Sequence, residues 1–357
     1  MKDFIPGLEL SDLFYQREVK PILAAEFKGL HYSAALIGHG SEVLGLDTPQ
    51  STDHDWGPRV IIFLAKRYFH RAKEVSKILG KKLPRQFLGY SVSPDNISSV
   101  RKGEQESRMH RIEITTIRKY FEEELGINPY AKLDYLDWLT FPQESLLPII
   151  SGRVFHDGLG ELKTIRKKFE YYPHDVWLFM LASQWDKIGQ EEPRVGRTGD
   201  VGDELGSQVI AGRIVKEIMK LCFLMERQYN PYDKWFGTAF LRLSSSKLLH
   251  PILKRALLSK TWKEREGYLA RAYEFLAKRH NNLKITKPLN THVSNFFGRP
   301  YKVINAGNFA QEIKMKIKNS KLKKMKLLGA VDQFTDSIPL GENPKLFRAL
   351  KGFLSQT

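Results

Sequence analysis

The chain has 357 residues, a formal net charge of +17 and 42% hydrophobic residues. This composition excludes a wholly disordered chain, and the length predicts two domains. No apolar run approaches the roughly 20 residues that a membrane-spanning helix needs, and the acidic, interrupted N-terminus is unlike a signal peptide. We therefore expect a cytoplasmic protein with no membrane partner. The single cysteine, Cys222, excludes an intrachain disulfide framework and a cysteine-based zinc cluster.

The positive charge is concentrated in the last third of the chain. Residues 251–357 hold 22 lysines and arginines against 7 acidic residues, and seven of the lysines lie between Lys314 and Lys326. Such a segment could attract phosphate backbones. A solvated surface is the simpler interpretation, because lysine dominates and arginine is the better specific phosphate ligand. An RNA contact through Lys314 to Lys326 is the alternative.

The first 126 residues alternate between helical and extended patterns. The periodicity and the glycine positions predict, in chain order, a helix over 8–28, strands over 31–38 and 59–64, a helix over 67–79 ended by Gly80, a strand over 110–117 and a helix over 117–125 ended by Gly126. We expect these elements to form a small mixed-sheet domain over residues 1–140.

The pattern becomes helical after Pro142. Helices are expected over 174–190, 204–229, 235–243, 247–259 and 262–281. The predicted architecture is α+β: the mixed-sheet domain is followed by an all-α domain over residues 141–288. A basic segment of mixed character then follows over residues 289–357.

The richest candidate site lies between the first two expected strands. Gly40 and Ser41 are followed, after eleven residues, by Asp53-His54-Asp55 and then by an apolar strand. Carboxylates at positions i and i+2 of an extended segment project to the same face, and they repel each other unless a cation lies between them. Mg²⁺ prefers oxygen ligands. The glycine-serine turn offers backbone N–H groups to a phosphate.

A third carboxylate usually completes such a site from a neighbouring strand. Glu113 is the candidate, because it lies between Ile112 and Ile114 and so faces away from the core that those residues enter. A lone acidic residue on a strand is most often part of a solvated face. No histidine has a companion at metal-ligand spacing, so no zinc site is expected.

The pattern Gly40-Ser41, eleven residues, Asp53-x-Asp55 resembles the polymerase β-type nucleotidyltransferase superfamily. Further stretches resemble bacterial nucleotidyltransferase-like proteins with a C-terminal domain of unknown function: residues 51–59, 171–197, 202–207, 230–240 and 329–337. This resemblance implies a nucleotidyltransferase fold followed by a helical domain, similar in plan to the kanamycin-type aminoglycoside nucleotidyltransferases. One departure is that Pro58 follows the aspartates, so the strand should begin after the site.

The resemblance also implies roles for particular residues. Gly40 and Ser41 would hold the triphosphate of a nucleoside triphosphate, and Asp53 and Asp55 would bind two Mg²⁺ ions with Glu113 as the third ligand. Arg59 could neutralise the leaving pyrophosphate or form a strand-end salt bridge.

The acceptor base would come from the helical domain, as it does in kanamycin-type enzymes. Glu191 or Glu192 is the candidate, because a carboxylate at the C-terminus of a helix is unfavourable and invites a functional explanation. We expect one of them, with Arg197, to face Asp53 and Asp55 across a cleft.

The leading hypothesis is Mg²⁺-dependent transfer of a nucleoside monophosphate from a nucleoside triphosphate to an acceptor hydroxyl, most simply on a small molecule. The first alternative is an RNA- or protein-directed nucleotidyltransferase that uses the basic last third. The second alternative is a catalytically silent nucleotide-binding module. The silent module is disfavoured because both aspartates, the glycine-serine turn and a third carboxylate are present together.

Overall fold

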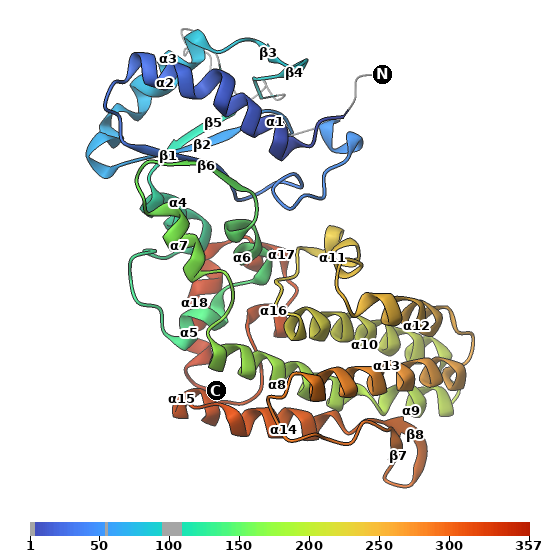
Figure 1. The fold of residues 1–357 in the computed structure, drawn as a ribbon. Helices are drawn as coiled ribbons and strands as arrows, with labels where there is room; N and C mark the ends of the chain where they lie inside the picture. Colours follow the sequence, from blue (N-terminus) through green and yellow to red (C-terminus); the bar gives the residue numbers. More distant parts are fainter. Residues whose placement is uncertain (1–3, 54–55, 95–108) are drawn as a thin grey trace. The chain divides into compact units, whose positions relative to one another are not determined.

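The computed structural model describes residues 4–53, 56–94 and 109–357 (Figure 1). The fold is mixed α/β and divides into two compact units. Unit 1 comprises Met1–Lys132 and Ser145–Glu170, and unit 2 comprises Leu133–Glu144 and Tyr171–Thr357.

Unit 1 is built on a four-stranded mixed sheet. Its strands are β1 (Tyr32–Leu36), β2 (Val60–Leu64), β5 (Ile112–Thr115) and β6 (Arg153–Asp157), in the order β5-β2-β1-β6. Strand β1 runs antiparallel to β2 and β6, whereas β2 and β5 are parallel. A separate two-stranded ribbon is formed by β3 (Gln86–Phe87) and β4 (Tyr90–Ser91). The expected small mixed sheet is therefore confirmed.

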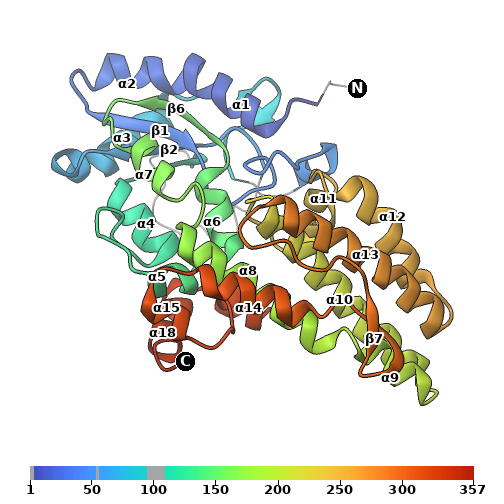
Figure 2. The same cartoon turned by 60° about the horizontal axis from the view of Figure 1, so that its bottom comes forward.

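Helices cover both faces of this sheet (Figures 1 and 2). One face carries α1 (Gly7–Phe14), a π-helical turn over Tyr15–Val19, α2 (Lys20–Glu26) and α3 (Ala72–Lys82). The other face carries α4 (Ile117–Leu125) and α7 (Leu162–Lys168). The first face holds the main core of the unit, which includes Leu10, Phe14, Val60, Ile62 and Leu79.

Several local predictions for unit 1 are confirmed and two need correction. Helix α4 has its expected bounds, and Gly126 ends it in the left-handed conformation with φ 64°. The helix expected over 67–79 is instead a 3₁₀ turn over Lys66–Arg71 followed by α3, which continues through the buried Gly80 to Lys82. The helix expected over 8–28 is helical to Glu26 but contains the π turn.

The boundary expected at residue 140 differs from the observed units. Residues 145–170 belong to unit 1 and supply β6, whose pairing with β1 is a contact distant in sequence. His156 and Asp157 end this strand. Asp157 accepts hydrogen bonds from the Ser33 hydroxyl at 2.7 Å and from the backbone N–H of Lys163 at 3.1 Å, so it ties β6 to both β1 and α7.

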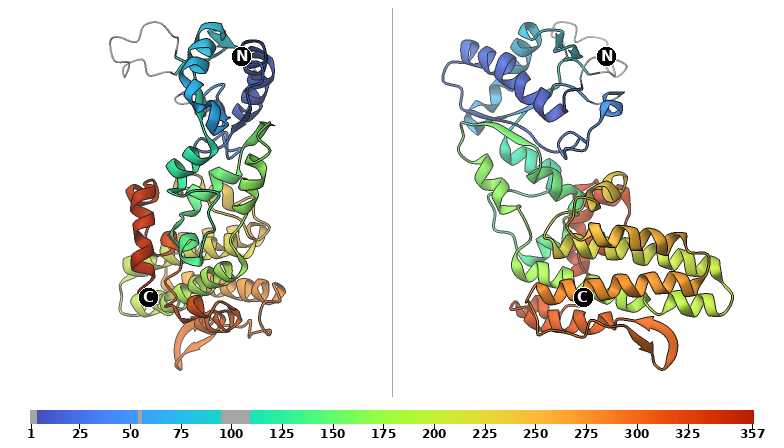
Figure 3. Two further views of the ribbon diagram at one scale, coloured as in Figure 1. Left: turned by 90° about the vertical axis from the view of Figure 1, so that its left-hand side faces the viewer. Right: turned by 45° about the vertical axis from the view of Figure 1, so that its right-hand side comes forward.

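Unit 2 is mainly helical. Its longer helices are α8 (His174–Glu191), α10 (Glu204–Met225), α12 (Ser246–Leu258), α13 (Trp262–Asn282), α14 (Ala306–Lys316) and α18 (Pro344–Leu354). The shorter ones are α5 (Tyr135–Thr140), α9 (Arg194–Asp200), α11 (Asp233–Phe240), α15 (Ser320–Lys324), α16 (Val331–Phe334) and α17 (Ile338–Gly341). Helix α6 (Gln143–Ile150) begins in unit 2 and ends in unit 1. A hairpin of β7 (Ser294–Phe296) and β8 (Arg299–Val303) projects from the helices (Figure 3).

All five helices expected in unit 2 are present, and α9 is an additional one. Its glycines obscured it in the sequence, because glycine weakens helices. The structure explains Gly199, since a Cβ atom there would collide with the Trp262 ring of α13. The residues after 288 do not form a separate segment but belong to unit 2, where α14 packs along α8. Within the described residues, no helix has both the length and the apolar character needed to cross a membrane.

Candidate functional site

The loop that follows β1 has a backbone suited to an anion. Gly40 has a φ of +129°, and a Cβ atom there would lie 2.6 Å from a carboxylate oxygen of Glu42 and closer still to the Arg59 guanidinium. Only glycine fits this position. The backbone N–H groups of Gly40 and Ser41 donate to no acceptor among the described residues, and Gly40 is exposed. Such N–H groups can donate hydrogen bonds to a phosphate oxygen.

Arg59 lies beside this loop at the start of β2. Its Nη2 atom forms an ion pair of 2.6 Å with Glu42 Oε1, and the same nitrogen donates to the carbonyl of His39. The Glu42 side chain is only 2% exposed. Arg59 Nε is buried and has no hydrogen-bond partner within the described part of the chain. The salt bridge that was one of the two expectations for Arg59 is thus present. The Nε–H group of the guanidinium is a further donor that no described residue uses.

Glu113 lies on the same sheet face as Arg59. It is opposite Ile61 in the parallel register of β2 and β5, and Ile61 is two residues after Arg59. As expected, Ile112 and Ile114 pack into the core while the exposed Glu113 points away from it. Partial enclosure of the carboxylate raises the pKa of Glu113, and Glu124 adds to this rise.

Helix α4 closes this side of the site with polar groups that the sequence did not single out. Glu124 accepts a hydrogen bond from His39 Nε2 at 3.3 Å.

The Tyr120 hydroxyl of the same helix is buried without a hydrogen-bond partner among the described residues. Burial raises the pKa of Tyr120 well above its usual value, and Glu124 and Glu113 raise it further. We call His39, Glu42, Arg59, Glu113, Tyr120 and Glu124 the loop–sheet site. Tyr120 and Glu124 come from α4, whereas Glu42 lies in the loop after β1, so no local motif brings the three together.

The paired aspartates lie just before β2. Asp53 is exposed and ends a 3₁₀ turn, so it is not on the extended segment that the i, i+2 argument assumed. Asp55 lies outside the described residues. Strand β2 begins at Val60, after Pro58, as the sequence indicated. No group of three potential metal ligands occurs among the described residues, so the assignment of Mg²⁺ to Asp53, Asp55 and Glu113 stays a prediction.

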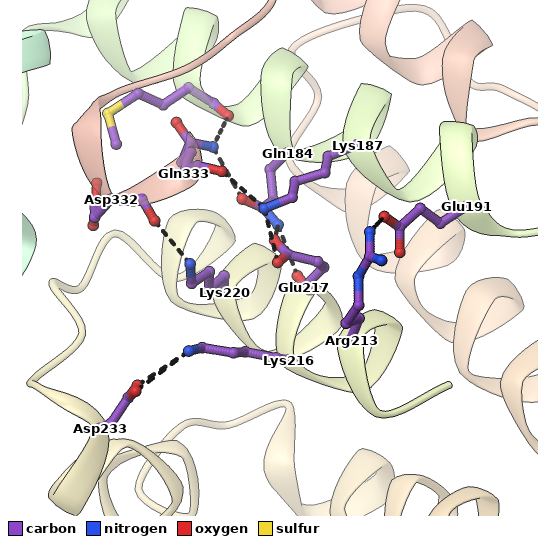
Figure 4. Close-up of polar contacts among 11 residues, drawn as sticks. Gln184, Lys187, Glu191, Arg213, Lys216, Glu217, Lys220, Asp233, Asp332 and Gln333 are labelled. Carbon is purple, nitrogen blue, oxygen red and sulfur yellow. Dashed lines mark hydrogen bonds and ion pairs between the residues drawn. The ribbon is translucent and has the colours of Figure 1, made fainter. Parts of the chain in front are cut away.

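The candidate bases lie in unit 2, where other groups contact them. Glu191 forms an ion pair with Arg213 of α10 (Figure 4). Glu192 accepts hydrogen bonds from the backbone N–H groups of Ile304 at 2.7 Å and Ala306 at 3.0 Å, and burial raises its pKa to about 7. Arg197 is exposed on α9. From the sequence, both glutamates are interpreted as carboxylates in an unfavourable position at a helix C-terminus. In the structure, contacts with other elements compensate the negative charge of each one. A role for either as acceptor base stays a prediction.

A family model described as a domain of unknown function, DUF4037, matches residues 138–236, from α5 to α11. Neither the curated proteins nor the solved structures contain a match.

Proposed function

We propose that unit 1 binds a nucleoside triphosphate with Mg²⁺ and transfers its nucleoside monophosphate to an acceptor hydroxyl. Two features suited to anions meet beside the loop after β1: the N–H groups of Gly40 and Ser41, which no described acceptor uses, and the Arg59 guanidinium. This juxtaposition favours a phosphate chain as the ligand.

In the proposed reaction the acceptor oxygen attacks the α-phosphorus and forms a new phosphoester bond. The bond from the α-phosphorus to the bridging oxygen breaks, and pyrophosphate leaves. Gly40, Ser41 and Arg59 would hold the leaving β- and γ-phosphates. Asp53 and Asp55 would hold Mg²⁺, with Glu113 as the third carboxylate. The metal would stabilise charge on the attacking and leaving oxygens.

The acceptor proton needs a base that is not bound to the metal. Glu191 or Glu192 remains the proposed candidate, with Arg197 as an additional phosphate contact. A small-molecule hydroxyl is the simplest acceptor. An RNA- or protein-directed transferase and a silent nucleotide-binding module are the alternatives, which the next experiment separates.

The test is incubation of the full chain with Mg²⁺ and each labelled nucleoside triphosphate, offering a metabolite extract and total RNA as acceptors. Label in a small molecule supports the leading proposal, and label in RNA or in protein supports the first alternative. Tight nucleotide binding without any labelled product indicates the silent module.

A charge-matched pair of double variants tests the residues. Asp53→Asn with Asp55→Asn should abolish transfer. Glu18→Gln with Glu26→Gln removes the same charge on the helices that cover the opposite sheet face, and it should leave transfer unchanged. Full turnover by a folded aspartate double variant would refute the proposed site.

A further inference from the structure

The lysine-rich run from Lys314 to Lys326 is a fixed part of unit 2. It covers the end of α14 and all of α15. Asp175 of α8 accepts hydrogen bonds from the backbone N–H groups of Lys318 at 3.1 Å and Asn319 at 2.7 Å. The Asn319 side chain caps α15. These hydrogen bonds hold the backbone of the run in a defined arrangement.

Two of the seven lysines join the two helices. The Lys314 amine donates to the Met325 carbonyl at 2.8 Å, and the Lys323 amine donates to the Met315 carbonyl at 2.7 Å. The other five lysines are exposed, and none forms an ion pair with any residue that the structure describes. We call these five the lysine patch: Lys316, Lys318, Lys321, Lys324 and Lys326.

We propose that the lysine patch binds the phosphodiester backbone of RNA or DNA. A nucleic acid presents closely spaced negative charges, and several unpaired ammonium groups carried by one fixed segment of the backbone neutralise them with release of counterions. The patch contains only lysines, which carry point charges on flexible stems and lack the rigid forked donors of arginine. Binding through it therefore depends on charge and not on base sequence.

The packing of the run disfavours a membrane surface. Binding to a bilayer interface by a basic helix needs an apolar face that can enter the lipid. Here the apolar side chains Ile313, Ile317, Leu322 and Met325 are all buried in unit 2. Met315, which is 65% exposed, is the one large apolar side chain that projects within the run. The exposed surface of the run is therefore mainly charged and lacks an apolar face that could enter a bilayer.

This binding is separate from the proposed transfer reaction. It involves unit 2 alone, so it is measured without Mg²⁺ or a nucleoside triphosphate. If the chain proved to have no transfer activity, the proposed binding of nucleic acid would be unaffected. Conversely, a patch that binds no nucleic acid would leave a small-molecule transferase intact.

The experiment measures binding of the full chain to a fluorescently labelled single-stranded RNA and to a DNA duplex, between about 50 and 200 mM salt. If all five lysines contact phosphates of the single strand, the slope of log K against log salt should approach about −3.5. Changing the base sequence at constant length should leave the affinity nearly unaltered.

Matched variants locate the contact. Lys316→Gln, Lys321→Gln and Lys324→Gln together should reduce the slope by about 2 and weaken binding at low salt. A control triple variant changes three exposed lysines elsewhere in unit 2: Lys247→Gln, Lys254→Gln and Lys278→Gln. An equal loss in the control would overturn the proposal. So would tighter binding to polyglutamate or to anionic phosphatidylserine vesicles than to either nucleic acid.

Discussion

The Glu192 carboxylate accepts a hydrogen bond from the backbone N–H of Ile304 at 2.7 Å, and its second oxygen accepts from Ala306 at 3.0 Å. The end of α8 is thereby joined to the start of α14. A carboxylate at a helix C-terminus is normally unfavourable, but here the free N–H groups before another helix compensate it. The main cost of this contact is loss of solvation, which raises the pKa of Glu192 to about 7.

This pKa predicts how stability depends on pH. A carboxyl group whose pKa rises from 4.5 to about 7 on folding binds its proton more tightly in the folded state. Its contribution is fully present below pH 4.5 and is lost as the pH rises through about 7, with a total on the order of 3 kcal/mol. Urea denaturation between about pH 4 and pH 8, a range that spans both pKa values, should show wild-type stability falling relative to Glu192→Gln as the pH rises.

Two further variants sharpen that comparison. The pKa of Glu266 is also raised to about 7 by burial, so Glu266→Gln should remove its own share of the dependence. Glu264→Gln changes an exposed side chain on the same helix and should run parallel to the wild type. Parallel curves for the wild type and Glu192→Gln would contradict the assignment.

Asp137 should be a strong determinant of the stability of unit 2. Its carboxylate pairs with Arg348 and, at 2.6 Å, with Lys351 of α18, and it is 10% exposed. Asp137→Asn would leave Arg348 without its ion pair and Lys351 with Asp134 as its remaining carboxylate partner, and we expect a loss of about 3 kcal/mol in the free energy of unfolding. Lys351→Met should cost about 1 kcal/mol or less, because that amine is partly solvated. Chemical denaturation measures both changes.

The pH dependence of this pair has the opposite sign to that of Glu192. Hydrogen bonds and ion pairs with Lys351 and Arg348 outweigh desolvation and lower the pKa of Asp137 from 3.8 to about 2. Its stabilisation is therefore present above pH 3.8 and is lost as the pH falls toward 2. Asp137→Asn should lack this loss in acid denaturation, and an unchanged acid transition would contradict the expectation.

Tyr120 is expected to tolerate loss of its hydroxyl. The group is buried without a partner among the described residues, so Tyr120→Phe removes an unsatisfied polar atom and should raise the free energy of unfolding by about 1 kcal/mol. Tyr15 provides the control, because its hydroxyl lies 3.1 Å from that of Tyr32. Tyr15→Phe should lower stability by about 1 kcal/mol. A destabilised Tyr120→Phe variant would show that the hydroxyl has a partner.

Arg59 combines a structural and a proposed binding role, and two substitutions separate them. Arg59→Lys keeps a cation beside Glu42 but loses the forked donors, so stability should be nearly retained while triphosphate affinity falls about tenfold. Arg59→Met leaves Glu42 buried without its ion pair and should cost about 3 kcal/mol. Calorimetric titration and urea denaturation report the two properties. Unchanged affinity in Arg59→Lys would exclude a specific phosphate contact.

Local patterns identified much of the secondary structure. The start and end of α4 follow from Thr116 and Gly126, because capping is decided by neighbouring residues. The apolar run Val60–Leu64 gave β2, and alternation around Glu113 gave the direction of that side chain. Strand β6 was missed, since its pairing with β1 brings together residues far apart in the chain.

The sequence by itself therefore determined periodicity, helix ends, the position of the Gly40 loop and the uneven charge. Only the tertiary structure decided which partner each charged side chain contacts. Glu42 came to lie against Arg59, Glu191 against Arg213, and Glu192 against the start of α14. The physical reason is that the pKa and the available hydrogen bonds of a side chain depend on burial and on neighbours from other elements, which no local spacing records.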